Sequence, residues 1–259
     1  MSEDRDHSSA PVEVEVERHD RVAVVRLVDH ERRNALSLPM VAAIVDAFDE
    51  LERDDGIGAV VVTGAPPAFC SGAVVGSLGR LANTDDDAER GSIVTVYDAF
   101  LRVLRSPLPT IAAVDGAAVG AGFNLALACD LRLAGPTARF ESRFLRIGIH
   151  PGGGHLWLLE RAVGPQAAAA CVLFGAAIDA QRAVETGLAW SSHPADELLD
   201  AAVELGARAA SAPKPLVART KASLKRVPWQ PDFDAAIATE LEAQTWSLAE
   251  GFFTPLPRS

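Results

Sequence analysis

The sequence predicts an α/β fold in which helices cover a mostly parallel sheet. Continuous apolar runs typical of buried strands, residues 59–63 and Thr110–Val114, alternate with longer segments of helical periodicity. Three loops rich in glycine and other small residues, 64–73, 115–122 and 148–155, place a ligand crevice at the carboxyl ends of the strands. A chain of 259 residues is long enough for one large domain with a helical appendage.

The N-terminal segment is expected to form a tail, a hairpin and a helix. Residues 1–11 are polar and are predicted to be disordered. Residues 12–18 alternate valine with glutamate and lead through a turn into 21–28, which indicates an antiparallel hairpin with one solvated face. Ser37 is suited to cap the helix Leu38–Arg53. The apolar stripe of this helix comprises Met40, Ile44, Ala47, Phe48 and Leu51.

The rest of the chain continues the alternation and then becomes helical. The acidic, irregular segment 78–91 is predicted to be a mobile flap, and 93–104 a helix that leads to the central strand Thr110–Val114. Short strands are expected at Leu131–Ala134, 139–140 and 188–191, and helices from 156, at 165–173, 180–186, 196–210, 213–225 and 232–250. We therefore divide the chain into a tail (1–11), a core domain (12–195) and a C-terminal helical region (196–259).

Composition excludes several classes of partner. The formal net charge of −11 argues against nucleic acid, because phosphate binding relies on clustered lysine and arginine. Cys70, Cys129 and Cys171 are an odd number without C-x-x-C spacing, so we expect reduced core thiols in a cytoplasmic protein, without disulfides or a metal site. The acidic N-terminus lacks the apolar stretch of a secretory signal, and no apolar run is long enough to span a membrane.

The stretch from Thr110 to Asp130 carries the clearest functional signal. An apolar strand passes through a loop of small residues into a helix, and this arrangement exposes backbone N–H groups at the helix N-terminus. Such groups suit an anion, or an oxygen that becomes negative during a reaction. Close packing of a strand-to-helix turn also requires small residues, so the loop alone leaves both interpretations open.

Five separated motifs together resemble those of the crotonase superfamily, the enoyl-CoA hydratase/isomerase family. They are Arg33-Asn34-Ala35-Leu36, the loop 68–73, the glycines of 112–122, Cys129-Asp130 and Pro151-Gly152-Gly153-Gly154. The resemblance covers residues 12–250. It implies a spiral of ββα turns with a C-terminal helical oligomerisation region, and hence a homotrimer or a dimer of trimers.

The resemblance also implies an acyl-CoA thioester as the ligand, with coenzyme A as part of the substrate and no other cofactor. Two backbone N–H groups would hold the thioester oxygen, and by position they belong to Ser71 and Ala121. The Ser71 hydroxyl could alternatively act as a nucleophile, but at this position the loop has to supply an N–H group. The residues assigned to substrate binding are Ala68, Cys70, Gly72, Ala73, Gly120, Phe144, Gly152 and Gly153.

The sequence departs from the hydratase pattern where protons are transferred. Hydratases of the family use two glutamates, and the matching positions hold Asn124 and Phe144. Asparagine orients water but accepts no proton, and phenylalanine does neither. Val74 also replaces a residue that is usually acidic. Because general acid–base catalysis contributes about 100- to 10,000-fold per group, we expect poor hydration of 2-enoyl-CoA.

Other residues could replace the missing base. His155 opens a helix, whose N-terminus favours the neutral, proton-accepting imidazole, but it is equally a candidate for capping or packing. His150 is expected to pack within its loop. Glu141 is expected to point away from Phe144 and to form a salt bridge with Arg143, Arg146 or a neighbouring subunit. Asp115 is a weaker candidate.

Three further expectations concern the surroundings of the site. Asp130 should make a structural hydrogen bond at a helix end, and Trp157 together with Phe144 should form the apolar pocket wall or core. Arg32 and Arg33 are either contacts for the coenzyme A phosphates or part of a solvated face.

Two classes of function remain. The first is an acyl-CoA enzyme that stabilises a thioester oxyanion or enolate with backbone N–H groups and uses non-standard acid–base residues such as Asn124 and His155. Its reaction would be isomerisation, thioester hydrolysis or C–C cleavage rather than ordinary hydration. The second is a catalytically silent acyl-CoA-binding or scaffolding protein with the same fold.

Overall fold

The protein contains two sheets, and residues of both pack in the larger of its two hydrophobic clusters. The computed structural model describes residues 13–74 and 87–253, with the side chains of Glu13 and of residues 87–94 left aside. The larger sheet has the order β1 (Glu13–His19), β2 (Val22–Val28), β3 (Ala59–Gly64), β5 (Thr110–Val114), β7 (Leu131–Ala134) and β10 (Ser191–Ser192). The smaller sheet has the order β4 (Ala68–Cys70), β6 (Ala117–Val119), β8 (Arg139–Glu141) and β9 (Ile178–Asp179).

Pairing in both sheets is mostly parallel, as the sequence predicts. The exceptions are the N-terminal hairpin β1–β2 and the pair β8–β9, which are antiparallel. The chain repeats a unit of one strand in the larger sheet, one strand in the smaller sheet and one helix: β3–β4–α3, β5–β6–α4 and β7–β8–α5. The predicted α/β fold built from ββα turns is therefore confirmed.

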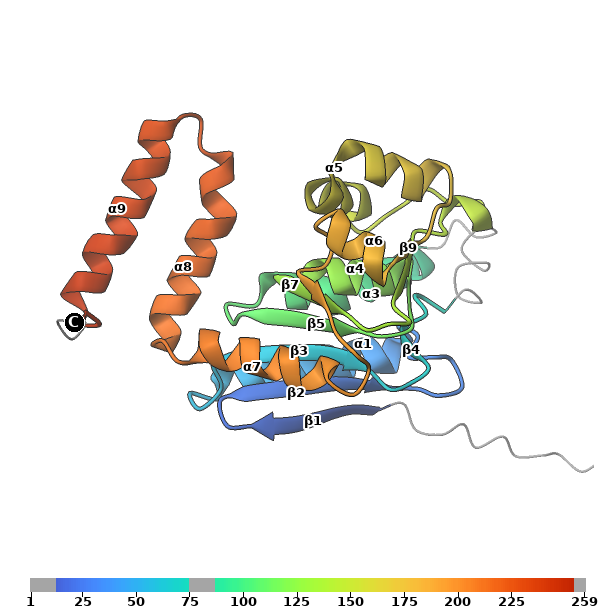
Figure 1. Cartoon of the computed structure of the whole chain (residues 1–259), viewed down its shortest axis with the longest axis horizontal. Helices are drawn as coiled ribbons and strands as arrows, with labels where there is room; N and C mark the ends of the chain where they lie inside the picture. The colour runs from blue at the N-terminus through green and yellow to red at the C-terminus, as the bar shows by residue number, and fades with distance from the viewer. Residues whose placement is uncertain (1–12, 75–86, 254–259) are drawn as a thin grey trace, which may run out of the picture.

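Helices cover both faces of the larger sheet (Figure 1). They are α1 (Leu38–Arg53), α3 (Asp87–Arg105), α4 (Ala121–Ala128), α5 (His155–Leu173), α6 (Ala180–Glu185), α7 (Leu198–Ala210), α8 (Lys214–Arg226) and α9 (Phe233–Ala249), with single 3-10 turns at η1 (Leu145–Ile147) and η2 (Val227–Trp229). Successive residues of each central strand point to opposite faces of the larger sheet. Val60 and Val62 therefore pack in the hydrophobic cluster that contains α1, α3 and α4. Val61 packs instead with α7.

Two predicted boundaries need correction. Helix α3 begins at Asp87 rather than at residue 93, so residues 87–91 are helical, and the rest of the predicted flap lies outside the described residues, as does the predicted N-terminal tail. The last strand is Ser191–Ser192 rather than 188–191. The two helices predicted from 156 and at 165–173 are confirmed as the two halves of α5 (His155–Leu173), which is interrupted by Gly164, at φ 75°, just before Pro165.

Helix α7 belongs to the core rather than to the C-terminal region in which we had placed it. Leu198, Ala202 and Ala210 are buried against strands β2, β3 and β5. A Cβ on Gly206 would lie 3.0 Å from Val22, so this helix approaches the sheet closely. Helix α7 thus packs on the larger sheet, while the division of the chain at residue 195 stays a prediction.

Lysines on α8 fix the C-terminal hairpin to the core. Lys214 donates to the carbonyls of Glu52 and Asp54, at 2.9 and 2.8 Å, where α1 ends. The buried Lys221 donates to Leu108 O at 2.6 Å and pairs with Asp130. Ammonium groups near the carbonyl ends of helices complement the negative ends of the helix dipoles. Helix α8 is thus held to the core by lysine hydrogen bonds and by the ion pair of Lys221 with Asp130.

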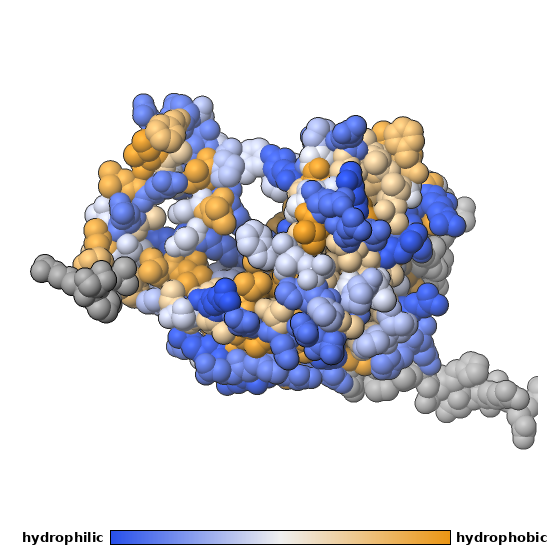
Figure 2. All heavy atoms as spheres, viewed as in Figure 1, coloured by the Kyte–Doolittle hydropathy of each residue, from blue (hydrophilic) through white to orange (hydrophobic). Residues whose placement is uncertain are grey.

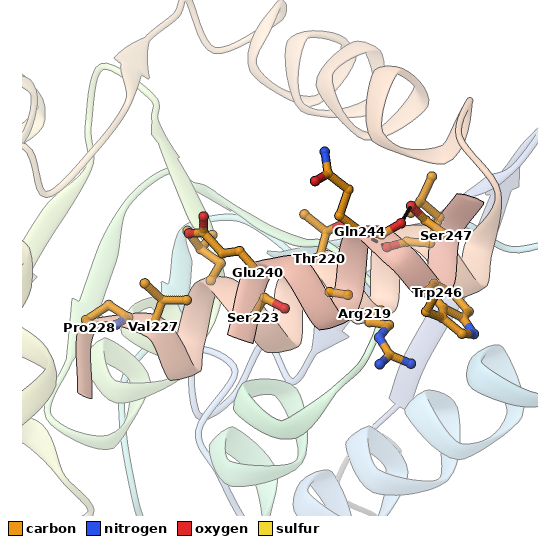
Figure 3. Close-up of a pocket in the computed structure, with 12 residues that line it drawn as sticks. Arg219, Thr220, Ser223, Val227, Pro228, Glu240, Gln244, Trp246 and Ser247 are labelled. Carbon is orange, nitrogen blue, oxygen red and sulfur yellow. Dashed lines mark hydrogen bonds between the residues drawn. The ribbon is translucent and has the colours of Figure 1, made fainter. Parts of the chain in front are cut away.

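The hairpin of α8 and α9 stands away from the sheets and exposes apolar side chains (Figures 1 and 2). These include Leu224, Phe233, Ile237, Leu241 and Leu248. A groove of about 420 Å³ lies between the two helices, lined by residues such as Leu216, Val227 and Trp246 (Figure 3). No helix among the described residues combines the length and apolar character needed to cross a membrane.

Candidate active site

A buried asparagine holds the first small-residue loop in place. The side chain of Asn34 has no exposed surface, and its amide donates to Ala65 O at 2.8 Å and Ala68 O at 2.7 Å. Its carbonyl oxygen accepts from Asp29 N at 2.9 Å. Asn34 has φ 60°, a conformation that asparagine tolerates better than most residues. One side chain therefore ties the loop before α1 to strand β4.

Ser71 does not offer the free N–H that the sequence analysis assigned to it. Its N–H donates to Arg33 O at 3.0 Å, and its hydroxyl donates to Arg32 O at 2.6 Å. Both donors are occupied by the backbone of the neighbouring loop. In this structure neither donor of Ser71 is free, so the role of its N–H as an oxyanion donor stays a prediction.

Ala73, two residues further, has the properties expected of that donor. Leu36 N donates to Gly72 O at 2.8 Å, and Leu36 forms a parallel bridge with Ala73. In this pattern the N–H of Ala73 points away from Leu36. It donates no hydrogen bond to any described residue, and Ala73 is partly exposed. No described residue therefore occupies the backbone donor at Ala73.

The second donor lies next to the first. Ala121 is the first residue of α4, so its N–H has no acceptor within the helix and donates to no other described residue. Gly72 has φ 99°, and a Cβ built there would lie 2.6 Å from Val119 O and 3.6 Å from Ala121 N. Glycine at this position lets the loop of Ala73 approach the N-terminus of α4.

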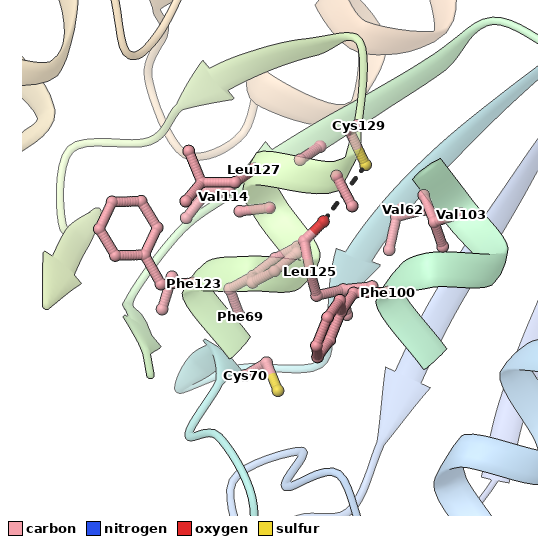
Figure 4. Packing of buried hydrophobic residues seen from close by; sticks show 14 of the residues in the cluster. Val62, Phe69, Cys70, Phe100, Val103, Val114, Phe123, Leu125, Leu127 and Cys129 are labelled. Atoms are coloured by element: carbon pink, nitrogen blue, oxygen red, sulfur yellow. Dashed lines mark hydrogen bonds between the residues drawn. The ribbon is translucent and has the colours of Figure 1, made fainter. Parts of the chain in front are cut away.

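Helix α4 is rigidly supported beneath these donors (Figure 4). All eight of its residues are buried, and Phe123 and Leu125 pack in the core with Phe69 and Cys70. A Cβ on Gly122 would lie 2.2 Å from Cys70 O, so only glycine allows this contact between α4 and β4. The side chains of Ala68 and Cys70, which the sequence analysis assigns to substrate binding, are buried.

Asn124 and His155 form a buried pair one helical turn beyond Ala121. Asn124 Nδ2 donates to Gly152 O at 3.0 Å, so its Oδ1 is the acceptor that lies 2.7 Å from His155 Nδ1. His155 Nδ1 must therefore carry a proton, and the neutral ring has its lone pair on Nε2. That nitrogen is buried without a hydrogen-bond partner. Both side chains are only 1% exposed.

The surroundings keep His155 neutral. Its ring packs 4.9 Å from Phe144 and 5.4 Å from Phe123, centroid to centroid. Burial lowers the pKa of His155 to about 4, because no acidic group compensates the charge of an imidazolium. The predicted neutral form is thus favoured by desolvation. The ring of His155 packs in the core, as the packing prediction requires. Its Nε2 lone pair has no partner among the described residues, so the role of His155 as a base stays a prediction.

The folded protein should lose stability through His155 as the pH falls. Between the ordinary pKa of 6.5 and about 4, the unfolded chain binds a proton that the folded chain does not, so the free energy of unfolding decreases toward acid pH. The expected loss is about 3 kcal/mol between pH 7 and pH 4. Urea unfolding of the wild type and of His155→Gln between pH 7 and pH 4 measures this loss in the free energy of unfolding. Parallel curves for the two proteins would contradict the assignment.

The third loop is shaped by side chains that press on its glycines. A Cβ on Gly152 would lie 2.4 Å from the Tyr97 hydroxyl, and one on Gly153 would lie 2.5 Å from Phe100. Gly152 and Gly153, predicted to contact substrate, therefore make room for α3 side chains. The N–H of Gly120, another predicted contact, donates to Glu141 O at 2.9 Å. The ring of Phe144 lies beside Gly120.

The other candidate bases are already committed. Burial would raise the pKa of Glu141, but hydrogen bonds from Arg143 and Arg139 outweigh it and hold that pKa below its usual value. The predicted salt bridge with Arg143 is confirmed, and Arg139 adds a second. Asp115 Oδ1 accepts three hydrogen bonds: from Thr137 N at 3.0 Å, from Thr137 Oγ1 at 2.6 Å and from Gly116 N at 3.1 Å. Neither carboxylate is available as a base.

The predictions for His150 and Trp157 have different outcomes. His150 lies in its loop with Nδ1 2.7 Å from Pro151 O, which agrees with local packing. Trp157, predicted as pocket wall or core, is 49% exposed and stacks on Trp229 with the Arg161 guanidinium about 4 Å from both rings. Trp157 therefore joins α5 to the C-terminal hairpin, and the prediction is wrong.

The remaining predicted residues are structural or exposed. Asp130 accepts from Thr110 N at 2.8 Å and from its hydroxyl at 3.0 Å, which confirms a structural hydrogen bond. Arg32 is exposed and lies 3.5 Å from the Asp29 carboxylate, and Arg33 is exposed. The cysteines Cys70, Cys129 and Cys171 are free and buried, as predicted. Burial raises the pKa of Cys70 to about 12, so it is no nucleophile.

Comparison with known proteins identifies the family to which this arrangement belongs. Residues 17–246 match the profile of the enoyl-CoA hydratase/isomerase family. The chain belongs to that family. It is 49% identical over 215 residues to the probable enoyl-CoA hydratase EchA14 of Mycobacterium tuberculosis, a match that covers 83% of this chain and 81% of the relative. The resemblance inferred from the five motifs is therefore confirmed.

Other members of the family agree in sequence and in structure. The 2,3-dehydroadipyl-CoA hydratase of Escherichia coli is 36% identical over 198 residues, which cover 76% of each chain. The crystal structure of an enoyl-CoA hydratase from Polaromonas sp. JS666 superposes with a TM-score of 0.85 at 28% identity and covers 92% of each chain. The crotonase fold is thus common to this chain and its structural neighbours.

Within this crotonase fold, sequence reasoning missed two features of the site. Asn34 was recognised as part of a motif, but its amide clamp on strand β4 was not foreseen. The hydrogen bond from Ser71 N to Arg33 O, which leaves Ala73 as the candidate donor of this loop, is the second. Gly72 was the available signal for the donor, since a glycine that must adopt positive φ reverses the direction of the chain just before Ala73.

Proposed function

We propose that this protein is an acyl-CoA enzyme that stabilises a thioester oxyanion or enolate with the N–H groups of Ala73 and Ala121. The observation that carries this proposal is that the N–H groups of Ala73 and Ala121 donate to no described residue, while Gly72 brings the first loop close to the N-terminus of α4. Donors aimed at a developing negative oxygen contribute roughly 3 kcal/mol each to catalysis. Membership of the enoyl-CoA hydratase/isomerase family supports the thioester as the ligand.

The proposed acid–base chemistry differs from that of a pair of carboxylates. Asn124 and Phe144 occupy the two positions that the family resemblance assigns to glutamates, and Glu141 and Asp115 are committed elsewhere. His155 Nε2 is the proposed proton acceptor, because it is a basic nitrogen without a partner beside Phe144. With a pKa of about 4 it is a weak base at neutral pH, which favours reactions of substrates with acidified α-protons over hydration.

The remaining parts of the proposal concern the ligand and the assembly. Coenzyme A enters as part of the substrate, and the exposed Arg32 and Arg33 beside the first loop are proposed to contact its phosphates. A homotrimer or a dimer of trimers is proposed, supported by the exposed apolar side chains of α8 and α9. A cytoplasmic location remains a prediction from composition.

Acyl-CoA binding is the first test of this function. A saturating acyl-CoA, at about 100 times its dissociation constant, should raise the melting temperature by roughly 5–10 °C, since ligand binding then adds about 2.7 kcal/mol. Differential scanning fluorimetry with acetyl-, butyryl-, hexanoyl- and decanoyl-CoA measures the shift, with free coenzyme A as the control. No shift with any of these esters would refute the binding proposal.

Product analysis then separates an enzyme from a silent binder. Mass spectrometry of a panel of acyl-CoA esters should show conversion of at least one ester, and turnover of 2-butenoyl-CoA to its hydrate should be low. His155→Ala should abolish the conversion, with Trp157→Ala as a control on the exposed side of the same helix. Binding without any product would favour the scaffolding alternative, and unchanged turnover in His155→Ala would remove His155 from the mechanism.

A further inference from the structure

The third loop fixes the orientation of the Asn124 side chain. Asn124 Nδ2 donates to Gly152 O at 3.0 Å, and Asn124 Oδ1 lies 2.7 Å from His155 Nδ1. A Cβ on Gly153 would lie 3.0 Å from Nδ2, so the loop packs directly on this amide. Because a carbonyl oxygen only accepts hydrogen bonds, Gly152 O determines which end of the amide faces His155.

The orientation of Asn124 in turn sets the state of the imidazole. Oδ1 only accepts hydrogen bonds, so the neutral ring carries its proton on Nδ1 and keeps the lone pair on Nε2. Without an acceptor at Nδ1, no hydrogen bond would hold the proton there, and the ring could place it on Nε2. A ring with its proton on Nε2 has no lone pair at that nitrogen.

Asn124 supplies this acceptor without a charge. The aromatic rings packed on His155 are those of Phe123 and Phe144, and neither of them nor Asn124 carries a charge. A carboxylate in place of the amide would also accept from Nδ1, but its negative charge would favour the imidazolium, in which both nitrogens are protonated. The amide therefore selects the tautomer and leaves the ring neutral.

We propose that Asn124 is a positioning residue, whose hydrogen bond to Nδ1 keeps Nε2 of His155 free of a proton so that Nε2 can accept one from the substrate. The inference rests on the proposed function, in which His155 Nε2 is the proton acceptor. It gives Asn124 a different role from the water-orienting one that the sequence suggests, because the amide acts through His155. It also accounts for an amide at a position where the family resemblance places a carboxylate.

The tautomer of His155 and the turnover of Asn124→Leu test this proposal together. In ¹⁵N NMR spectra of the ligand-free wild type at neutral pH, assigned with His155→Gln, Nδ1 should be protonated and Nε2 unprotonated. Leucine is similar in size to asparagine and removes the acceptor, so Nε2 should become at least partly protonated. Its kcat should fall at least about tenfold, with KM within about twofold of the wild type, on the ester that the mass-spectrometric panel identifies.

Asn124→Asp is the matched variant, because it keeps the acceptor for His155 and loses only the donor to Gly152 O. Nδ1 should keep its proton in this variant. The carboxylate raises the pKa of His155, so turnover should increase with pH and come within about tenfold of the wild type under alkaline conditions. A side chain that only packs would give no such recovery.

Four results would overturn the proposal and leave the oxyanion donors of the proposed function untouched. They are a wild-type ring protonated on Nε2, an Asn124→Leu protein with the wild-type tautomer, unchanged turnover in that variant, and no alkaline recovery in Asn124→Asp. If Asn124→Leu does not fold, the wild-type spectrum and Asn124→Asp decide. If the wild type converts no acyl-CoA ester, the proposed function fails and this inference fails with it.

Discussion

Ala121→Pro should lower the turnover of any acyl-CoA substrate by about 100-fold or more. Proline lacks the backbone N–H, and loss of one oxyanion donor costs about 100- to 1,000-fold in turnover. Ala121 is the first residue of α4, the position at which a helix accepts proline best, because its N–H has no intrahelical acceptor. The substitution therefore removes the proposed donor and leaves the helix ladder intact.

The matched control is Ala121→Gly, which retains the N–H and loses only a methyl group. It should keep turnover within about tenfold of the wild type, whereas the proline variant should not. Steady-state kinetics on whichever ester the mass-spectrometric panel identifies provides the measurement, and circular dichroism with a thermal scan verifies that both variants fold. A folded proline variant with near-normal turnover would exclude Ala121 as a donor.

Asn34→Ala should destabilise the fold by about 4 kcal/mol or more. The substitution leaves Asp29 N, Ala65 O and Ala68 O without their buried partner, and each such group costs about 1–3 kcal/mol. Alanine at φ 60° adds about 1 kcal/mol of backbone strain. A loss of this size is a large fraction of the stability of an ordinary domain.

Urea unfolding measures this effect, with Arg33→Ala as the control. Arg33 is the exposed neighbour of Asn34 and has φ 53°, so its replacement tests the same backbone geometry without the amide clamp. We expect the control to lose less than about 1 kcal/mol. If Asn34→Ala loses no more than the control, the amide hydrogen bonds do not hold the loop.

The fold was predictable because its signals are local. The continuous apolar runs predict the bounds of β3 and β5 to within one residue, and Ser37 correctly predicts the start of α1. Where the sequence reading failed, the decisive contacts are distant in sequence. Helix α7 resembles the C-terminal helices in composition, but Leu198 and Ala202 bury against the face of the sheet that carries Val61.

The loops that form the candidate site were predictable, whereas the hydrogen-bonding state of each backbone N–H was not. The motifs located both loops and the N-terminus of α4, but which N–H remains free depends on the pairing of residues 71–73 with 33–36. The pairing of Asn124 with His155 joins residues 31 apart, and its tautomer follows from the bond between Asn124 and Gly152. A lone sequence contains no signal for such contacts.

The vibrational frequency of the bound thioester carbonyl tests the central claim most directly. Two N–H donors polarise the C=O bond, and a polarised bond has a lower stretching frequency. Infrared difference spectra of an acyl-CoA labelled with ¹³C at the thioester carbonyl should therefore show a shift to lower frequency in the wild type and a smaller shift in Ala121→Pro. A bound carbonyl with the same frequency as in free solution would contradict the proposed role of Ala73 and Ala121.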